Sequence, residues 1–234
     1  MRHASTKGFS LVEMSIALII VGLLTSAIFG GMKLVSYAKI RALNAAKDAR
    51  QSEIYGFFSK YGEYPGDFSE ATTYWNLPSV TAGDGDGAVA FKNADGAYEG
   101  YNAWQHLSLA KMTDRDYAGA IGGLATPIPE THVPTSVFGG GFFMANGYGG
   151  HDDANTLAIG APKSMTDALS LNGLLAPKDA RDADKKYDDG NPSQGIMHAI
   201  DGADVSGGDC VTTGDYNLSV DARTCVLAYK IMSQ

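Results

Sequence analysis

The sequence predicts an α+β protein in which a long N-terminal helix packs on an antiparallel β-sheet head with long glycine-rich loops. Three observations lead to this class. The chain begins with an apolar run, an amphipathic segment follows it without a proline, and the rest alternates short β-like runs with glycine-rich stretches. Its 234 residues suffice for one ordinary domain with an appendage and are marginal for two full domains.

The apolar run has the length of a membrane span. Residues 14–32 carry no charged side chain, and as a helix they extend about 28 Å, close to the hydrocarbon thickness of a bilayer. Taken alone, the run fits a cleaved secretory signal, a plain membrane anchor or a buried core helix. Thr25-Ser26-Ala27 offers a cleavage site for the first of these. However, the apolar region of a secretory signal is normally shorter and seldom begins with an acid such as Glu13.

The residues before the run form a specific motif. The leader MRHASTKG is short and basic and ends in Gly8, Phe9 follows, and Glu13 is the fifth residue after Gly8. This combination resembles the class III signal of type IV prepilins and type II secretion pseudopilins. The resemblance implies a type IV pilin-like fold.

The resemblance also implies a processing step and an assembly contact. A prepilin peptidase would cut between Gly8 and Phe9 and methylate the new amino terminus on Phe9. The carboxylate of Glu13 would then pair with the Phe9 ammonium group of an adjacent subunit. Each charge is costly alone in a low-dielectric bundle, and pairing offsets most of that cost, so the pair would set the register of assembly.

One departure from the family pattern leaves two explanations open. Many pilins carry a proline in the middle of this helix, where it helps the helix to unwind on assembly. This chain has Gly30-Gly31 at that place. The pair would allow local unwinding, because glycine disfavours helix, or close helix packing in the membrane.

The helix is predicted to continue beyond the apolar run. Apolar residues recur at spacings near three and four from Leu34 to Tyr61, with charged and polar residues between them, which predicts an amphipathic helix. Gly62 is suited to cap its end, and Pro65-Gly66 predicts a turn. The expected regions are a cleaved leader at 1–8, a helix at 9–61 with 9–32 in the membrane, and a globular head at 62–234.

The head is expected to contain short strands and two further helices. One helix is predicted within 101–113, and the other begins near Pro177 in the stretch 174–190. Strands are predicted at 136–145, 156–161, 195–200 and 225–232. The segments YPGD, GDGDG, WQHL and KKYDDGNP resemble a branch of prepilin-like proteins from Gram-negative bacteria.

Two cysteines, Cys210 and Cys225, lie near the C-terminus behind a membrane segment. This arrangement predicts one disulfide in an oxidising compartment, although two reduced core cysteines would fit the same positions. The disulfide would close a loop of about 15 residues and stabilise the head by about 3 kcal/mol in the chain-entropy model.

A calcium site is the one metal site that the sequence suggests. Asp84 and Asp86 alternate with glycines as in calcium loops, and Asp95 stands at the twelfth position. The loop is not an EF-hand, because position 88 is alanine and no glutamate stands at the twelfth place. Some pseudopilins bind calcium in the head, so the resemblance adds support. A solvated turn without an ion explains the same residues.

Other chemistry has no motif behind it. The net charge is −8 and the pI is about 5.0, and no basic patch after residue 60 indicates a nucleic-acid groove. The histidines lack zinc-ligand spacing, and no nucleophile elbow or phosphate loop is present. The sequence therefore does not predict an enzyme, and no cofactor is expected to be required.

The expected function is a structural subunit of a type IV pilus or a type II secretion pseudopilus. The resemblance implies as partners other pilin or pseudopilin subunits, a prepilin peptidase and an inner-membrane assembly platform. The subunit would cross the bacterial inner membrane once and then enter a periplasmic or extracellular filament, where cell adhesion is one role. The alternative is a membrane-anchored, calcium-dependent binding or adhesion module that does not polymerise.

Overall fold

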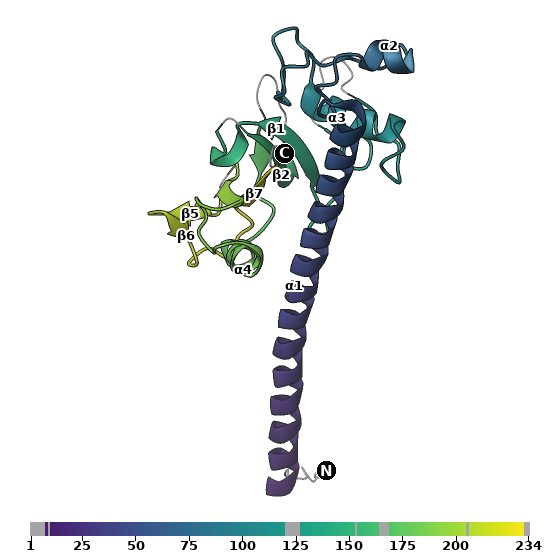
Figure 1. Ribbon diagram of the computed structural model, residues 1–234. Coiled ribbons are helices and arrows are strands. Elements are labelled where there is room, and N and C mark those ends of the chain that lie inside the picture. Colours follow the sequence, from purple (N-terminus) through teal and green to yellow (C-terminus); the bar gives the residue numbers. More distant parts are fainter. Residues whose placement is uncertain are drawn as a thin grey trace, which may run out of the picture. The chain divides into compact units, whose positions relative to one another are not determined.

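The computed structural model describes residues 8, 10–119, 127–152, 154–163, 169–204 and 206–231 (Figure 1). The chain divides into two compact units, residues 1–41 and 42–234. The first helix, α1 (Leu11–Tyr61), begins in the first unit and ends in the second. The sheet and the other helices lie in the second unit, which is called the head below.

In the first unit, α1 exposes its apolar side chains. Leu11 is 86% exposed and Leu34 is 71% exposed. The helix contains an 18-residue window of mean hydropathy 2.3, none of which is buried within the structure. By length and composition this part of α1 can cross a membrane.

The end of α1 follows from its cap. The helix ends at Tyr61, and Gly62 adopts a left-handed conformation with φ of 80°. The Gly62 N–H donates a hydrogen bond to the Phe58 carbonyl at 2.8 Å, which satisfies one of the last carbonyls of the helix. The structure therefore confirms that Gly62 caps the helix.

Within the head, α1 buries a face that is not purely apolar. Leu43, Ile54 and Phe57 are buried, as the periodicity predicts. Lys47, which the pattern places among the polar residues, is also buried, at 7% exposed. Its ammonium group is 2.6 Å from Asp48 and lies over the ring of Tyr229, 5.2 Å from the centroid. The long lysine side chain thus packs along the interior while its charge stays paired.

The central sheet is antiparallel and contains the four predicted strand regions, with shifted ends. The strands follow the order β1-β2-β7-β4, and the short β3 pairs with β2. β2 and β7 are paired on both sides, and their central residues are buried. The strands are β1 (Gly141–Asn146), β2 (Asn155–Pro162), β3 (Leu171–Asn172), β4 (Met197–Asp201) and β7 (Cys225–Lys230).

Two predicted helices are present in the head. Helix α3 (Glu99–Leu109) is almost wholly buried and packs on β1. Gly100 permits this approach, because a Cβ there would lie 2.3 Å from the Met144 carbonyl oxygen. Helix α4 (Pro177–Tyr187) starts with Pro177 in its first turn, where proline is tolerated.

The shortest elements were not foreseen. They are the strand β3 and also α2 (Ala71–Trp75), the 3-10 turn η1 (Tyr148–Gly150), β5 (Val211–Thr212) and β6 (Asp215–Tyr216). Elements of two to five residues carry too little periodicity to stand out in a sequence. Helix α2 contributes Trp75 to an aromatic cluster with Phe57, Phe68 and His106, which closes the head around the end of α1.

The predicted disulfide is present. Cys210 and Cys225 are bonded, with a Cα–Cα distance of 4.9 Å, and both residues are fully buried. Asp201 pairs with Cys225 in the β4–β7 register, and its carboxylate accepts the Cys210 N–H at 2.6 Å. The disulfide therefore ties the loop that follows β4 to the start of β7.

Candidate functional site

The N-terminal end of α1 contains a capping box made by Ser10 and Glu13. The Glu13 carboxylate accepts the Ser10 N–H at 2.9 Å, and the Ser10 hydroxyl accepts the Val12 N–H at 3.3 Å. Two N–H groups that lack a partner within the helix are thereby satisfied. A serine followed three residues later by a glutamate is the sequence signature of a capping box. This signature could have predicted the capping role of Ser10 and Glu13, which the family resemblance does not indicate.

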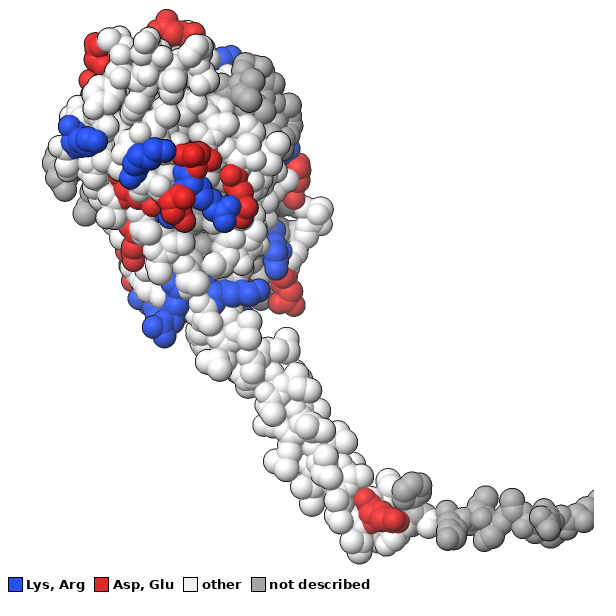
Figure 2. Space-filling view, turned by 90° about the vertical axis from the view of Figure 1, so that its right-hand side faces the viewer, with Lys and Arg blue, Asp and Glu red and all other residues white. Residues whose placement is uncertain are grey.

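The surface around Glu13 is otherwise uncharged. Glu13 is the one charged residue between positions 10 and 32. Figure 2 shows the same contrast, with a single acidic patch near the end of an uncharged stretch and charges of both signs on the head. Residues 10–32, which the structure describes, contain no lysine, arginine or histidine, so this stretch offers the Glu13 carboxylate no cationic partner. Phe9 and residues 1–7, which carry the expected cleavage point and leader, lie outside the described residues.

Gly22, Gly30 and Gly31 lie on the exposed part of the same helix. A Cβ built at any of them would meet no heavy atom within 4 Å beyond the helix's own backbone. The helix is continuous through Gly30-Gly31. These glycines therefore leave open surface on the helix, and both explanations of the pair stand.

The acidic residues of the predicted calcium loop are brought together with a different partner. The carboxylate oxygens of Asp67, Asp84 and Asp86 lie within 4.8 Å of one another. Asp95, the third predicted ligand, is not part of this group. Asp67 was missed because it lies 17 residues before Asp84, in the YPGD segment, where nothing in the local pattern points to the loop.

Asp67 is engaged as the anchor of that loop. Its carboxylate accepts the backbone N–H groups of Gly85 at 2.8 Å, Asp86 at 3.1 Å and Gly87 at 2.9 Å. The residue is fully buried. Burial raises the pKa of Asp67, while the N–H donors act in the opposite direction. Calcium takes six to eight oxygen ligands, so backbone carbonyl groups and water would have to supply the ligands that these three carboxylates do not.

Glu99 supports the same loop from the start of α3. Its carboxylate accepts the Ala90 N–H at 2.7 Å, the Asn93 side-chain amide at 2.9 Å and the Asp84 N–H at 3.3 Å. Burial raises the pKa of Glu99 to about 7, because the charged form is poorly solvated there. The loop is thus built on two buried carboxyl groups that the sequence did not single out.

A second acidic group lies at the end of α4. The carboxylates of Asp184, Asp188 and Asp189 also lie within 4.8 Å of one another. The Asp188 carboxylate accepts the N–H groups of Ile196 at 2.7 Å and Met197 at 2.8 Å, so it holds the start of β4. These bonds give Asp188 of the KKYDDGNP segment a structural role.

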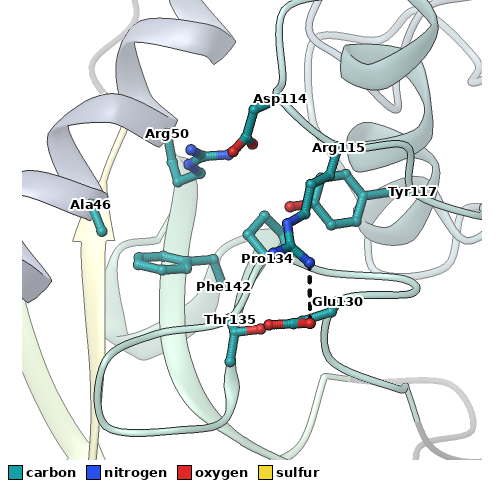
Figure 3. Close-up of a pocket in the computed structure, with 9 residues that line it drawn as sticks. All are labelled: Ala46, Arg50, Asp114, Arg115, Tyr117, Glu130, Pro134, Thr135 and Phe142. Atoms are coloured by element: carbon teal, nitrogen blue, oxygen red, sulfur yellow. Dashed lines mark hydrogen bonds and ion pairs between the residues drawn. The ribbon is translucent and has the colours of Figure 1, made fainter.

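The head has a small hollow between α1 and residues 114–117 and 130–135 (Figure 3). It holds about 190 Å³ and combines charged side chains with the apolar Phe142 and Pro134. Figure 3 shows Arg115 reaching Glu130 across the opening, at 3.1 Å. Glu53 lies next to this region, and burial raises its pKa to about 7, while Arg50, 3.0 Å away, acts in the opposite direction.

His106 holds a structural position in the head. His106 is fully buried; its Nδ1 accepts the Gly66 N–H and its Nε2 contacts the Thr81 carbonyl, both at 3.0 Å. Burial lowers its pKa to about 4, so the ring stays neutral. Together with the absence of zinc spacing in the sequence, these contacts give no arrangement for catalysis at His106.

Comparison with known proteins bears on the N-terminal segment. Residues 4–29 match the family model described as the prokaryotic N-terminal methylation motif. A search of curated proteins finds no match. Among solved structures, the major type IV pilin PilA1 from Clostridium difficile is similar, with a TM-score of 0.36 and 11% sequence identity, over 85% of this chain and 98% of that chain. With so low a TM-score and sequence identity, this structural similarity carries no argument about the family. The match of residues 4–29 to the family model is the finding that bears on the family.

Proposed function

We propose that this chain, which carries the N-terminal signature of the type IV pilin and pseudopilin family, is a structural subunit of a filament of that kind. The observation that carries the proposal is the methylation motif at residues 4–29, joined directly to a helix whose apolar side chains are exposed. Such a surface is stable only when lipid or other apolar helices cover it. Membrane insertion followed by helix packing provides both environments.

Assembly would depend on the exchange of a contact at Glu13. Before assembly the carboxylate caps the Ser10 N–H. Cleavage after Gly8 would create an ammonium group on Phe9, and the Glu13 carboxylate of a neighbouring subunit would be its counter-charge. A charge pair in low dielectric is strongly favoured over two separate charges, so a subunit would fit only in the register that completes the pair.

The polymer would grow because the contact is heterologous. The amino terminus of one subunit meets Glu13 of another, so two joined subunits still have one unused amino terminus and one unused Glu13 between them. Contacts of this kind generate open helical filaments when they do not close into a ring. A prepilin peptidase and an inner-membrane assembly platform would act before this step. The product would be an extracellular pilus or a periplasmic pseudopilus.

The test is the chemical state of the mature N-terminus. We expect mass spectrometry of the native protein to find a chain that begins with N-methylated Phe9. A chain that begins at Met1, or near Ile28 after secretory cleavage, would contradict the proposal and favour a membrane-anchored binding module. The way in which the filaments are released distinguishes the two products. Shearing of cells would release an extracellular pilus, whereas a periplasmic pseudopilus would be recovered only after detergent treatment of the envelope.

A further inference from the structure

The connection between β1 and β2 folds back over the sheet and is held there by two histidines. The described residues of this connection, 147–152 and 154, are called the tip. It includes η1, which contacts β2, β4 and β7. His151 comes from the tip and His198 from β4.

The two histidines make reciprocal contacts. Nε2 of His151, on the tip, lies 3.2 Å from the Ala228 carbonyl oxygen of β7. Nδ1 of His198, on the sheet, lies 2.9 Å from the Gly149 carbonyl oxygen of the tip. A carbonyl can only accept, so each ring nitrogen must carry the hydrogen. The neutral tautomers are thereby determined: His151 is protonated on Nε2 and His198 on Nδ1.

The rings themselves are in contact. Their centroids are 3.7 Å apart and their planes are inclined by 19°. His151 is buried, at 5% exposed. Burial, and next the neighbouring His198, lower the pKa of His151. Two rings in this geometry accommodate one added proton far better than two, because the second charge would lie against the first.

Glycines allow the tip to come this close. Gly149 has a φ of 72°, and a Cβ there would lie 2.3 Å from the Ala228 Cβ. Gly150 has a φ of 82°, and a Cβ there would lie 3.3 Å from Nδ1 of His198. The tip is therefore seated directly on β7 and β4, where the histidine contacts, backbone packing and the partly buried side chain of Tyr148 hold it.

Taken together, the charged groups around His151 and His198 favour the neutral state of the two rings. Lys230 of β7 disfavours a charge on His151, and Asp188, which follows α4, favours it. The Asp188 carboxylate is already engaged by the N–H groups of Ile196 and Met197. Asp152, next to His151, is exposed to solvent. Lys230 thus opposes a charge on the rings, while Asp188 is already hydrogen-bonded and Asp152 is solvated.

From this geometry we propose that the tip is an acid-released flap. It is seated on β4 and β7 while both rings are neutral, and it lifts when both are protonated. The open nitrogens, Nδ1 of His151 and Nε2 of His198, take up the two protons, so the carbonyl contacts are not replaced. Release follows from repulsion between two stacked cations beside Lys230. The consequence is that the face of β4 and β7 beneath the tip becomes accessible in acid.

The test is hydrogen exchange of the full chain in detergent at pH 7.5 and pH 5.0, corrected for the intrinsic effect of pH. We expect exchange in peptides that cover 146–154 to rise by about tenfold or more in acid, while peptides from α3 stay protected, because local opening leaves the core folded. Equal protection of the tip at both pH values would overturn the proposal.

Two variants separate charge from hydrogen bonding. His198→Asn and His151→Gln each place a neutral amide donor where the ring N–H stands, and each should abolish the acid response. His132→Asn is the control, because His132 accepts the Ile128 N–H at 3.0 Å in another part of the head and should leave the response intact. A variant that retains the wild-type response contradicts the proposal.

A measurement on the unaltered chain covers the case in which a variant does not fold. Nuclear magnetic resonance of labelled histidine should show the His151 ring taking up its proton at lower pH than an ordinary histidine, over the same pH range in which the tip loses protection. Protonation of the His151 ring over a range in which the tip stays protected would overturn the flap.

Discussion

The hydroxyl group of Tyr216 donates a hydrogen bond of 2.7 Å to the carboxylate of Asp184, and both residues are buried. Tyr216 lies on β6 and Asp184 on α4, so the bond joins the disulfide-closed loop to the helix that precedes β4. The second Asp184 oxygen accepts the Gly190 N–H at 3.1 Å. Asp184 is thus a junction between two segments far apart in the sequence.

Loss of this bond should destabilise the head. For Tyr216→Phe we expect the free energy of unfolding to fall by about 1.5–3 kcal/mol, because a buried carboxylate loses a donor. Chemical denaturation of the full chain in detergent measures the change. Tyr187→Phe is the matched control, since the Tyr187 hydroxyl makes no hydrogen bond within the described residues, and it should change stability little. Equal effects of both variants would show that the bond does not matter.

Substitution of Glu13 separates its two roles. Glu13→Gln keeps an oxygen that can cap the Ser10 N–H but removes the charge. We expect insertion and cleavage to continue and filaments to be lost, since a neutral amide cannot replace a charge at the pair. Sheared filament fractions and mass spectrometry of the subunit measure the two outcomes.

The control for that experiment is Ser10→Ala, which removes the acceptor of the Val12 N–H and leaves the Glu13 charge in place. It should still assemble. Normal filaments from Glu13→Gln would mean that Glu13 acts as a helix cap and not as a charge partner.

Stability should depend on pH through Glu53. Its pKa is raised from 4.5 to about 7 in the folded chain, so the folded state holds the proton more tightly than the unfolded state. The stabilising contribution is therefore complete below pH 4.5 and is lost as the pH rises through 7. Glu53→Gln should remove this dependence, which amounts to on the order of 1–2 kcal/mol after allowance for solvent screening of a partly exposed group.

The measurement is the free energy of unfolding of wild type and Glu53→Gln from pH 5 to pH 8. Glu130→Gln is the control, because Glu130 forms an ion pair with Arg115 in which both side chains are more than half exposed. His106 contributes with the opposite sign, since its pKa is lowered to about 4 and its contribution is lost in acid. Parallel curves for wild type and Glu53→Gln would contradict the assignment.

The loop at 84–88 should depend on Asp67 and not on a metal ion. Asp67→Asn places an amide NH₂ or a weaker acceptor opposite three N–H donors, and should lower the free energy of unfolding by about 1–3 kcal/mol. Asp95→Asn, outside the acidic group, should have little effect. EDTA should leave the melting temperature of wild type unchanged; a clear drop that calcium reverses would show that an ion completes the site.

Several features follow from local sequence alone. The apolar run of the N-terminal helix and its cap at Gly62 are encoded in adjacent residues, because helix periodicity and capping act over one or two turns. The methylation motif is equally local. The disulfide was predictable because two cysteines allow only one intramolecular pair.

Only the tertiary structure decided which polar groups meet inside the head. Asp67 reaches the loop at 84–88, Tyr216 reaches Asp184, and His151 stacks on His198, although none of these pairs is close in sequence. Lys47 is buried because Tyr229 of β7 lies beside it. Such contacts depend on a sheet order that sets β7 between β2 and β4. That order results from burial of the whole apolar surface at once, which the periodicity of a single segment does not contain.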